Sequence, residues 1–137
     1  MTIALAHRFA RALESHDVET LRDWIAVDYI QHNPYVPQGL EGVRSFFDAW
    51  NAAFTDTSVT VEDAISSGDR LIGRFAYRGR HTGEFMGIPA TGKEVHMTSI
   101  DIWRVVDGKL VEHWDEINSA EFFAQLGGMP SLPSVES

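Results

Sequence analysis

The sequence predicts an α+β fold in which N-terminal helices cover one face of a curved antiparallel sheet. Two observations support this class. Apolar residues recur at helical spacing as far as about residue 54, whereas residues 59–117 alternate and are rich in β-branched and aromatic side chains. A chain of 137 residues suits one core, so we expect residues 1–137 to form a single domain. If the sheet curls around the helices, a small-molecule pocket can lie between them.

Three helices are expected before the sheet. The first has an apolar stripe that ends near Ser15, and the second runs from a candidate N-cap at Asp17 to about residue 25. A short extended segment, DYIQHNP (residues 28–34), follows and ends at a proline. The third helix begins after Gly39 and has the most apolar stripe of the three, with its last aromatic residue at Phe54.

Four strands are expected to follow as an antiparallel meander, separated by turn and loop signals. Their ranges are Val59 to Ser66, Leu71 to His81, Val95 to Val106 and Leu110 to Ile117. A last short helix covers about residues 120–126 and ends at Gly127-Gly128, which is a C-cap signal. Residues 128–137 are expected to form a loose tail.

The segment GIPATGKE (residues 87–94) comes close to the phosphate-binding pattern G-x-x-x-x-G-K. That pattern requires Ser or Thr after the lysine and then a helix, but here Glu94 follows and the next residues alternate as in a strand. Pro89 also removes an amide that a phosphate would need. We therefore interpret the segment as a connection between two strands.

The composition excludes several classes of function. A net charge of −9 disfavours nucleic acids and anionic membrane surfaces as partners. The absence of cysteine excludes disulfides, thiolate nucleophiles and cysteine-based zinc sites. The first residues show neither a signal peptide nor a membrane span, so a cytoplasmic location is expected.

Two aspartates in the predicted sheet are the main candidates for catalysis, because aspartate is depleted in strands. A two-residue loop at Asp107-Gly108 would place Asp115 opposite Ile100, whereas a turn with a glycine bulge would place it opposite Asp101. We expect the bulge, which sets the two carboxylates on one sheet face. Such a pair should keep a proton to higher pH than an isolated aspartate, because burial and mutual repulsion both oppose ionisation.

Histidines and polar residues around these aspartates complete the predicted site. His113 is two residues from Asp115 and so shares its face, and His32 could lie either in the pocket or on the surface. These three residues match the ligand set of a metal facial triad, but we predict that no metal is used. The residues expected to bind substrate are Asn33, Trp50, Tyr77, His81, Ser99 and Trp103, with core packing as the alternative for Trp50, Tyr77 and His81.

Three segments, YIQHNP, GEFMGIPATGK and DIWRVVDGKLVEHWDEIN, together resemble the SnoaL-like polyketide cyclases of the nuclear transport factor 2-like superfamily. The resemblance runs from about Ala4 to Leu126. It implies a cone-shaped α+β barrel, usually a homodimer, with a pocket between the curved sheet and the helices. It also implies that Asp115 is the acid/base, and that Ser99 and Asp101 stand where the family's cyclases carry Gln and His.

We therefore expect a cofactor-free enzyme, most simply a polyketide cyclase that performs an intramolecular aldol condensation of a small aromatic or poly-carbonyl substrate. Its catalytic residues would be Asp115, Asp101, His113 and His32. Polyketide hydroxylase, isomerase or epoxide hydrolase activity, or a non-catalytic ligand-binding dimer module, are alternatives on the same fold. The expected partners are a hydrophobic small molecule and a second copy of the chain, which would pack across the outer sheet face near Ile100 and Ile102.

Overall fold

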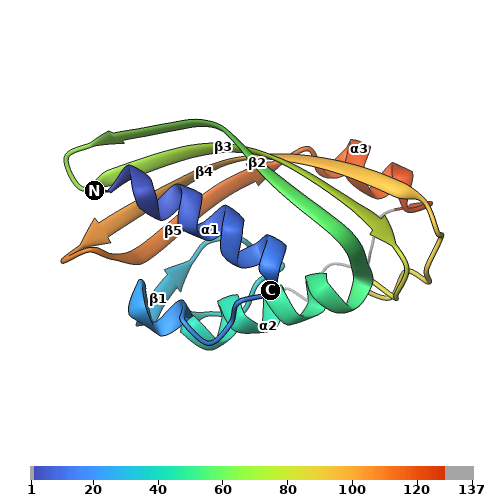
Figure 1. Cartoon of the computed structure of the whole chain (residues 1–137), viewed down its shortest axis with the longest axis horizontal. Helices are drawn as coiled ribbons and strands as arrows, with labels where there is room; N and C mark the ends of the chain where they lie inside the picture. Colours follow the sequence, from blue (N-terminus) through green and yellow to red (C-terminus); the bar gives the residue numbers. More distant parts are fainter. Residues whose placement is uncertain (1, 129–137) are drawn as a thin grey trace, which may run out of the picture.

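The computed structural model describes residues 2–128, which form an α+β domain as predicted (Figure 1). In chain order its elements are α1 (Ile3–Ser15), a 3₁₀ turn (Leu21–Asp23), β1 (Ile25–Gln31), α2 (Gly39–Ala53), β2 (Phe54–Ser67), β3 (Arg70–His81), β4 (Glu94–Val106), β5 (Lys109–Ile117) and α3 (Ser119–Gln125). The predicted loose tail, apart from Gly128, lies outside the described residues. None of the described helices is long and apolar enough to cross a membrane.

The sheet is mixed rather than wholly antiparallel. Its strand order is β1-β5-β4-β3-β2, and strands β2 to β5 form the predicted antiparallel meander. Strand β1 pairs with the remaining edge of β5 in the parallel direction, which the sequence analysis did not predict. A parallel pair needs a long crossover and leaves no local turn signal in the sequence. The pairing brings the end of β1 beside β5 and so contributes directly to the site.

The predicted second helix is wrong. Residues 17–25 contain a single 3₁₀ turn, after which Ile25 begins β1. Asp17 accepts hydrogen bonds from the backbone N–H and the hydroxyl of Thr20, at 3.3 and 2.8 Å, and so closes a tight turn instead of capping an α-helix. Leu21 and Ile25, whose spacing suggested the helix, are buried as expected. In so short a segment, buried positions do not distinguish a helix from a turn followed by a strand.

The hairpin between β4 and β5 combines a two-residue turn with a bulge. Asp107 and Gly108 both have positive φ, 51° and 75°, as a type I′ turn requires. The register shifts by one residue further along β5, where Val111 is the extra residue. Asp101 therefore lies opposite Asp115, as predicted, although the bulge lies inside β5 rather than at the turn.

An aromatic cluster joins α1 and α2 to the inner face of the sheet. Phe9 of α1 packs against Phe47, Phe75 and Trp103, with ring centroids 5.8, 5.4 and 5.5 Å away. The contacts with Phe47 and Phe75 are edge-to-face, and such pairs add stabilisation beyond simple burial. Figure 1 shows that α1 and α2 lie on the same side of the sheet, while α3 lies near the end of β5. Phe54, expected to end the third helix, instead begins β2.

The connection between β3 and β4 is the predicted loop and not a phosphate site. Phe85 and Ile88 pair across a tight turn in which Met86 and Gly87 have positive φ. Glu94 then begins β4, so no helix follows the glycine-lysine pair. The interpretation of GIPATGKE as a strand connection is confirmed.

Candidate active site

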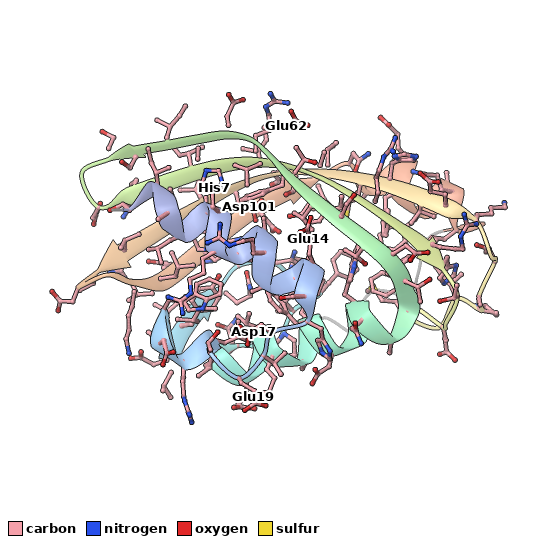
Figure 2. All side chains as sticks on the ribbon, viewed as in Figure 1. His7, Glu14, Asp17, Glu19, Glu62 and Asp101 are labelled. Atoms are coloured by element: carbon pink, nitrogen blue, oxygen red, sulfur yellow. The ribbon has the colours of Figure 1, made fainter. Side chains whose placement is uncertain are left out.

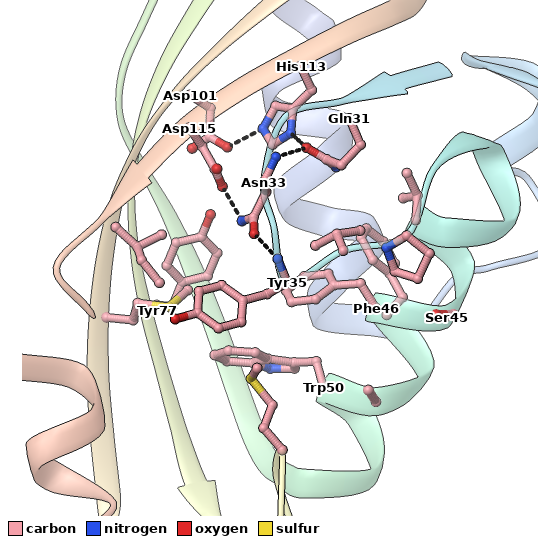
Figure 3. Close-up of a pocket in the computed structure, with 18 of the residues that line it drawn as sticks. Gln31, Asn33, Tyr35, Ser45, Phe46, Trp50, Tyr77, Asp101, His113 and Asp115 are labelled. Carbon is pink, nitrogen blue, oxygen red and sulfur yellow. Dashed lines mark hydrogen bonds and ion pairs between the residues drawn. The ribbon is translucent and has the colours of Figure 1, made fainter. Parts of the chain in front are cut away.

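A pocket of about 150 Å³ opens between the inner sheet face, α2, α3 and the loop that joins β1 to α2 (Figure 3). Its wall is mostly aromatic, with Tyr35, Phe46, Trp50, Phe85, Phe122 and Phe123 among the lining residues. Its exposed rim includes Pro37, Ser45 and Ala49. Polar groups gather where β1, β4 and β5 meet (Figure 3). A largely apolar pocket with a few grouped polar side chains is typical of a small-molecule site.

Asp115 is the half-buried carboxyl group of this polar end. Burial raises its pKa, and the nearby charge of Asp101 raises it further. His113 and a hydrogen bond from Nδ2 of Asn33, 3.1 Å from the Asp115 carboxylate, oppose this rise without cancelling it. The raised pKa agrees in direction with the prediction for the carboxylate pair. It suits a group that must accept a proton and later return it.

Asp101 is buried next to Asp115, and its short contacts go to other partners. Its Oδ1 accepts a hydrogen bond from the Ser99 hydroxyl at 2.6 Å, and its Oδ2 lies 2.7 Å from Nε2 of His113. The hydroxyls of Ser99 and Tyr77 lie 2.9 Å apart. Burial raises the pKa of Tyr77 well above its usual range, so Tyr77 remains protonated and can donate to Ser99. In contrast to exposed carboxylates such as Glu19 and Glu62, Asp101 lies inside the molecule (Figure 2).

His113 joins Asp101 to β1. Its ring stacks on Trp103, with centroids 5.1 Å apart, and its Nδ1 lies 2.8 Å from Oε1 of Gln31. The ring is almost completely buried. Both ring nitrogens therefore have hydrogen-bond partners within the protein.

The same three residues could present ligand atoms to a metal ion. One atom each from Asp101, His113 and Asp115 lies within 4.8 Å of the others. An ion would have to replace the 2.7 Å contact between Asp101 and His113, so the hydrogen bond and an ion compete for the same atoms. That no metal is used stays a prediction, which adding a chelator to the active enzyme would test.

Comparison with protein families adds evidence that is independent of the site geometry. Residues 3–126 match the model of the SnoaL-like polyketide cyclases. The chain belongs to the SnoaL-like polyketide cyclase family. The resemblance inferred from the three sequence segments is thereby confirmed.

Three individual proteins similar to this SnoaL-like chain are named as cyclases or as a hydroxylase. The chain is 28% identical over 131 residues to an aklanonic acid methyl ester cyclase of Streptomyces peucetius, which covers 91% of this chain and 90% of the relative. It is 35% identical to the structure of IdmH from Streptomyces antibioticus, provisionally assigned as a polyketide cyclase, with a TM-score of 0.74 and coverage of 91% and 98%. It is 28% identical to AclR from Streptomyces galilaeus, provisionally assigned as a hydroxylase, with a TM-score of 0.82 and coverage of 96% and 84%.

Three of the four residues predicted to be catalytic in this SnoaL-like chain are brought together, and His32 is not. Its ring stacks on Trp114 at 4.9 Å, and its Nε2 lies 2.8 Å from Glu112 on the outer sheet face. Successive residues of an extended chain point to opposite faces, so Gln31 and Asn33 face the pocket and His32 points away. This placement contradicts the predicted role of His32 in the site.

Six residues were predicted to bind substrate, and three of them, Asn33, Trp50 and Tyr77, line the pocket. The structure corrects the placement of the other three. Ser99 lies behind Asp101 and Tyr77, and Trp103 is in the core, where its Nε1 donates to the Tyr29 hydroxyl at 3.0 Å. His81 holds the β3–β4 loop, because its Nδ1 accepts a hydrogen bond from the backbone N–H of Thr91 at 3.2 Å.

Several residues that line the pocket were not predicted, notably Gln31, Tyr29 and Tyr35. Tyr29 and Gln31 lie on β1, in the part of the chain (residues 28–34) that was predicted to be extended. Their spacing of two from each other and from Asn33 places all three residues on one face, and this signal could have identified them. Tyr35 lies in a loop, where no periodicity indicates direction.

Proposed function

We propose that this protein is a polyketide cyclase that closes a ring by an intramolecular aldol reaction. The observation that carries the proposal is Asp115, a half-buried carboxyl group with a raised pKa in an aromatic pocket. The relative from Streptomyces peucetius is named as a cyclase of a methyl ester, and the family is that of polyketide cyclases. The proposed substrate is therefore a polyketide ester, and the aldol reaction requires that it has several carbonyl groups. Trp50, Tyr77 and Asn33 would contact it.

In the proposed reaction Asp115 moves one proton. Its carboxylate removes a hydrogen from a carbon between two carbonyl groups, and the electrons of the broken C–H bond form an enolate. The enolate carbon bonds to a second carbonyl carbon of the same molecule, whose π electrons move to its oxygen. That oxygen takes the proton back from Asp115. The product is an isomer of the substrate, and the substrate's own carbonyl groups delocalise the charge.

Asp101 and His113 would support this step through their charge and hydrogen bonds. They lie beside Asp115. The charge of His113 lowers the pKa of Asp115, and the charge of Asp101 raises it. Burial keeps them out of bulk water, where the same charges would have a much weaker effect. Both are therefore included in the proposed catalytic site.

Product analysis tests the proposal. Purified protein is incubated with methyl esters of polyketides that carry a 1,3-dicarbonyl side chain, and products are followed by mass spectrometry and oxygen consumption. A cyclic isomer of unchanged mass without oxygen uptake is expected. The relative AclR makes hydroxylation the second candidate. A product that gains one oxygen atom while O₂ is consumed would replace the cyclase proposal, and tight binding without turnover would indicate a binding module.

The proposed assembly is a homodimer across the outer sheet face. Three isoleucines and a tryptophan form one row across four strands, because Ile65 pairs with Ile72, Ile72 with Ile102, and Ile102 with Trp114. Ile65 and Ile102 are 56% and 38% exposed. An apolar row on the surface favours a partner, and a second copy can bury the same row on both molecules.

A further inference from the structure

Gln31 is the last residue of β1, and its side chain is buried at the polar end of the pocket. Its Oε1 has two nitrogen neighbours, the backbone nitrogen of Asn33 at 3.0 Å and Nδ1 of His113 at 2.8 Å (Figure 3). The backbone N–H and carbonyl of Gln31 are both bonded to the side-chain amide of Gln38, at 2.8 and 2.7 Å. The position of Gln31 is therefore held by both its backbone and its side chain.

These contacts determine which nitrogen of His113 carries a proton. A backbone N–H can only donate, so the atom of Gln31 that contacts Asn33 must be the amide oxygen. An amide oxygen can only accept, so Nδ1 of His113, which faces the same atom, must carry hydrogen. The remaining nitrogen, Nε2, faces Oδ2 of Asp101 at 2.7 Å.

A second proton must lie between Nε2 of His113 and Asp101, because two bare acceptors would repel each other at this distance. With both protons present, the His113–Asp101 pair has no net charge. Without an acceptor at Nδ1, a neutral imidazole with its hydrogen on Nε2 becomes favourable beside the Asp101 carboxylate. The pair then has a net negative charge, and this charge opposes the ionisation of Asp115.

We propose that Gln31 is a positioning residue of the active site. Its amide oxygen holds the Nδ1 proton of His113 and thereby keeps the His113–Asp101 pair without net charge beside Asp115. Among residues 2–128, the titratable group that faces His113 besides Asp101 and Asp115 is Tyr29 of β1, whose ring stacks on it at 6.1 Å. Burial raises the pKa of Tyr29 well above its usual range, so Tyr29 adds no charge.

Nitrogen-15 NMR of histidine-labelled protein tests the proton arrangement without substrate, and His113→Gln assigns the resonances. We expect a directly bonded proton on Nδ1 of His113 in the wild type. Gln31→Met removes the acceptor at similar volume and should move the Nδ1 resonance toward that of an unprotonated nitrogen. Gln31→Glu keeps an acceptor and should keep the proton. An unprotonated Nδ1 in the wild type would overturn the proposal, even if no variant folds.

The pH dependence of kcat/KM is the second test, and only this part rests on the proposed function. Gln31→Met should shift the acid side of the profile to higher pH and lower kcat/KM there about tenfold, because an uncompensated negative charge then lies near Asp115. A merely structural role would lower kcat/KM equally at every pH, and that result would overturn the proposal. If no cyclisation occurs at all, the NMR result still decides the role of Gln31.

Gln125→Met is the matched control. The Gln125 side-chain amide also bonds to a strand backbone. It accepts from the N–H of His96 and donates to the carbonyl of His96, both at 2.8 Å, but it lies outside the pocket. This variant should leave the Nδ1 resonance of His113 and the pH profile unchanged. Changes equal to those of Gln31→Met would show a general effect of glutamine loss and would overturn the proposal.

Discussion

The environment that suits Asp115 for proton transfer should also reduce the stability of the fold at neutral pH. Burial raises its pKa in the folded protein, so the unfolded chain ionises first as the pH rises and is favoured by that ionisation. We expect Asp115→Asn to raise the melting temperature at neutral pH. At a pH below the pKa of an unfolded aspartate the difference should vanish, because the wild-type residue is then neutral in both states. Thermal melts at the two pH values measure it.

Asp28→Asn is the control for that comparison, since Asp28 is an exposed aspartate of β1. It should change the melting temperature little at either pH. If Asp115→Asn melted below the wild type at neutral pH, that result would contradict a raised pKa of Asp115 in the folded protein.

Asn33 tunes the same carboxyl group from the opposite direction. Its Nδ2 donates to Asp115, and this hydrogen bond lowers the pKa of the carboxyl. Asn33→Ala should therefore move the acid side of the kcat/KM profile to higher pH and reduce kcat/KM about tenfold there. Asn51→Ala, an exposed asparagine of α2, should leave the profile as it is. A shift to lower pH in Asn33→Ala would mean that Asn33 does not stabilise the charged carboxylate.

The residues of the site were predictable where they lie on the β4–β5 hairpin. Asp101 and Asp115 attract attention because aspartate is unusual in strands, and His113 follows from the alternation of β5. The face of Gln31 follows from its spacing of two from Asn33, but its contact with His113 could not be predicted, because it joins residues 82 positions apart. Its role depends on the parallel pairing of β1 with β5, for which the sequence contains no local signal.

At the scale of elements, the register of the β4–β5 hairpin was predicted correctly, but the position of its bulge was not. The prediction required one extra residue somewhere between Asp101 and Asp115 and assigned it to the turn. The structure has a two-residue turn, and the extra residue is Val111 within β5. Turn residues such as Asp-Gly can be recognised in a sequence. A bulge inside a strand needs no particular residue type and only adds one residue to that strand, so its position cannot be recognised in the same way.

Helix α2 contains a glycine on which two effects act in opposite directions. Alanine is the better helix former by about 1 kcal/mol, so Gly42→Ala would stabilise an isolated helix. In the fold, a Cβ at this position would overlap the backbone of Pro37 at the pocket rim. Overpacking against backbone costs about 1–3 kcal/mol, so we expect a net loss in the free energy of unfolding and a raised KM. Chemical denaturation and steady-state kinetics measure both effects.

Glu41→Ala provides the comparison for Gly42→Ala, because Glu41 is an exposed neighbour on the same helix. Its effect should stay within about 0.5 kcal/mol. A Gly42→Ala protein more stable than the wild type would show that the rim yields to the added methyl group at no cost.

At the scale of the whole molecule, the outer sheet face should hold two copies together. Ile102→Asp places a charge in the centre of the apolar row and should shift the protein toward monomers by at least tenfold in the dissociation constant. Light scattering over a range of concentrations measures this. Val27→Asp, at a position that is 79% exposed and outside the row, should leave assembly unchanged. A wild-type mass near 15.3 kDa at every concentration would contradict the dimer.

The most direct test of the central claim is the pH dependence of kcat/KM for cyclisation by the wild type and by Asp115→Asn. If Asp115 is the acid/base, the wild-type rate rises with pH through a single ionisation whose pKa lies above that of an isolated aspartate, as its burial requires. Asp115→Asn keeps the shape of the side chain and should lose about 10²–10⁴-fold in kcat/KM at pH values above that pKa while it remains folded, and the difference should shrink as the pH falls below it. Near-normal turnover by folded Asp115→Asn would contradict the claim.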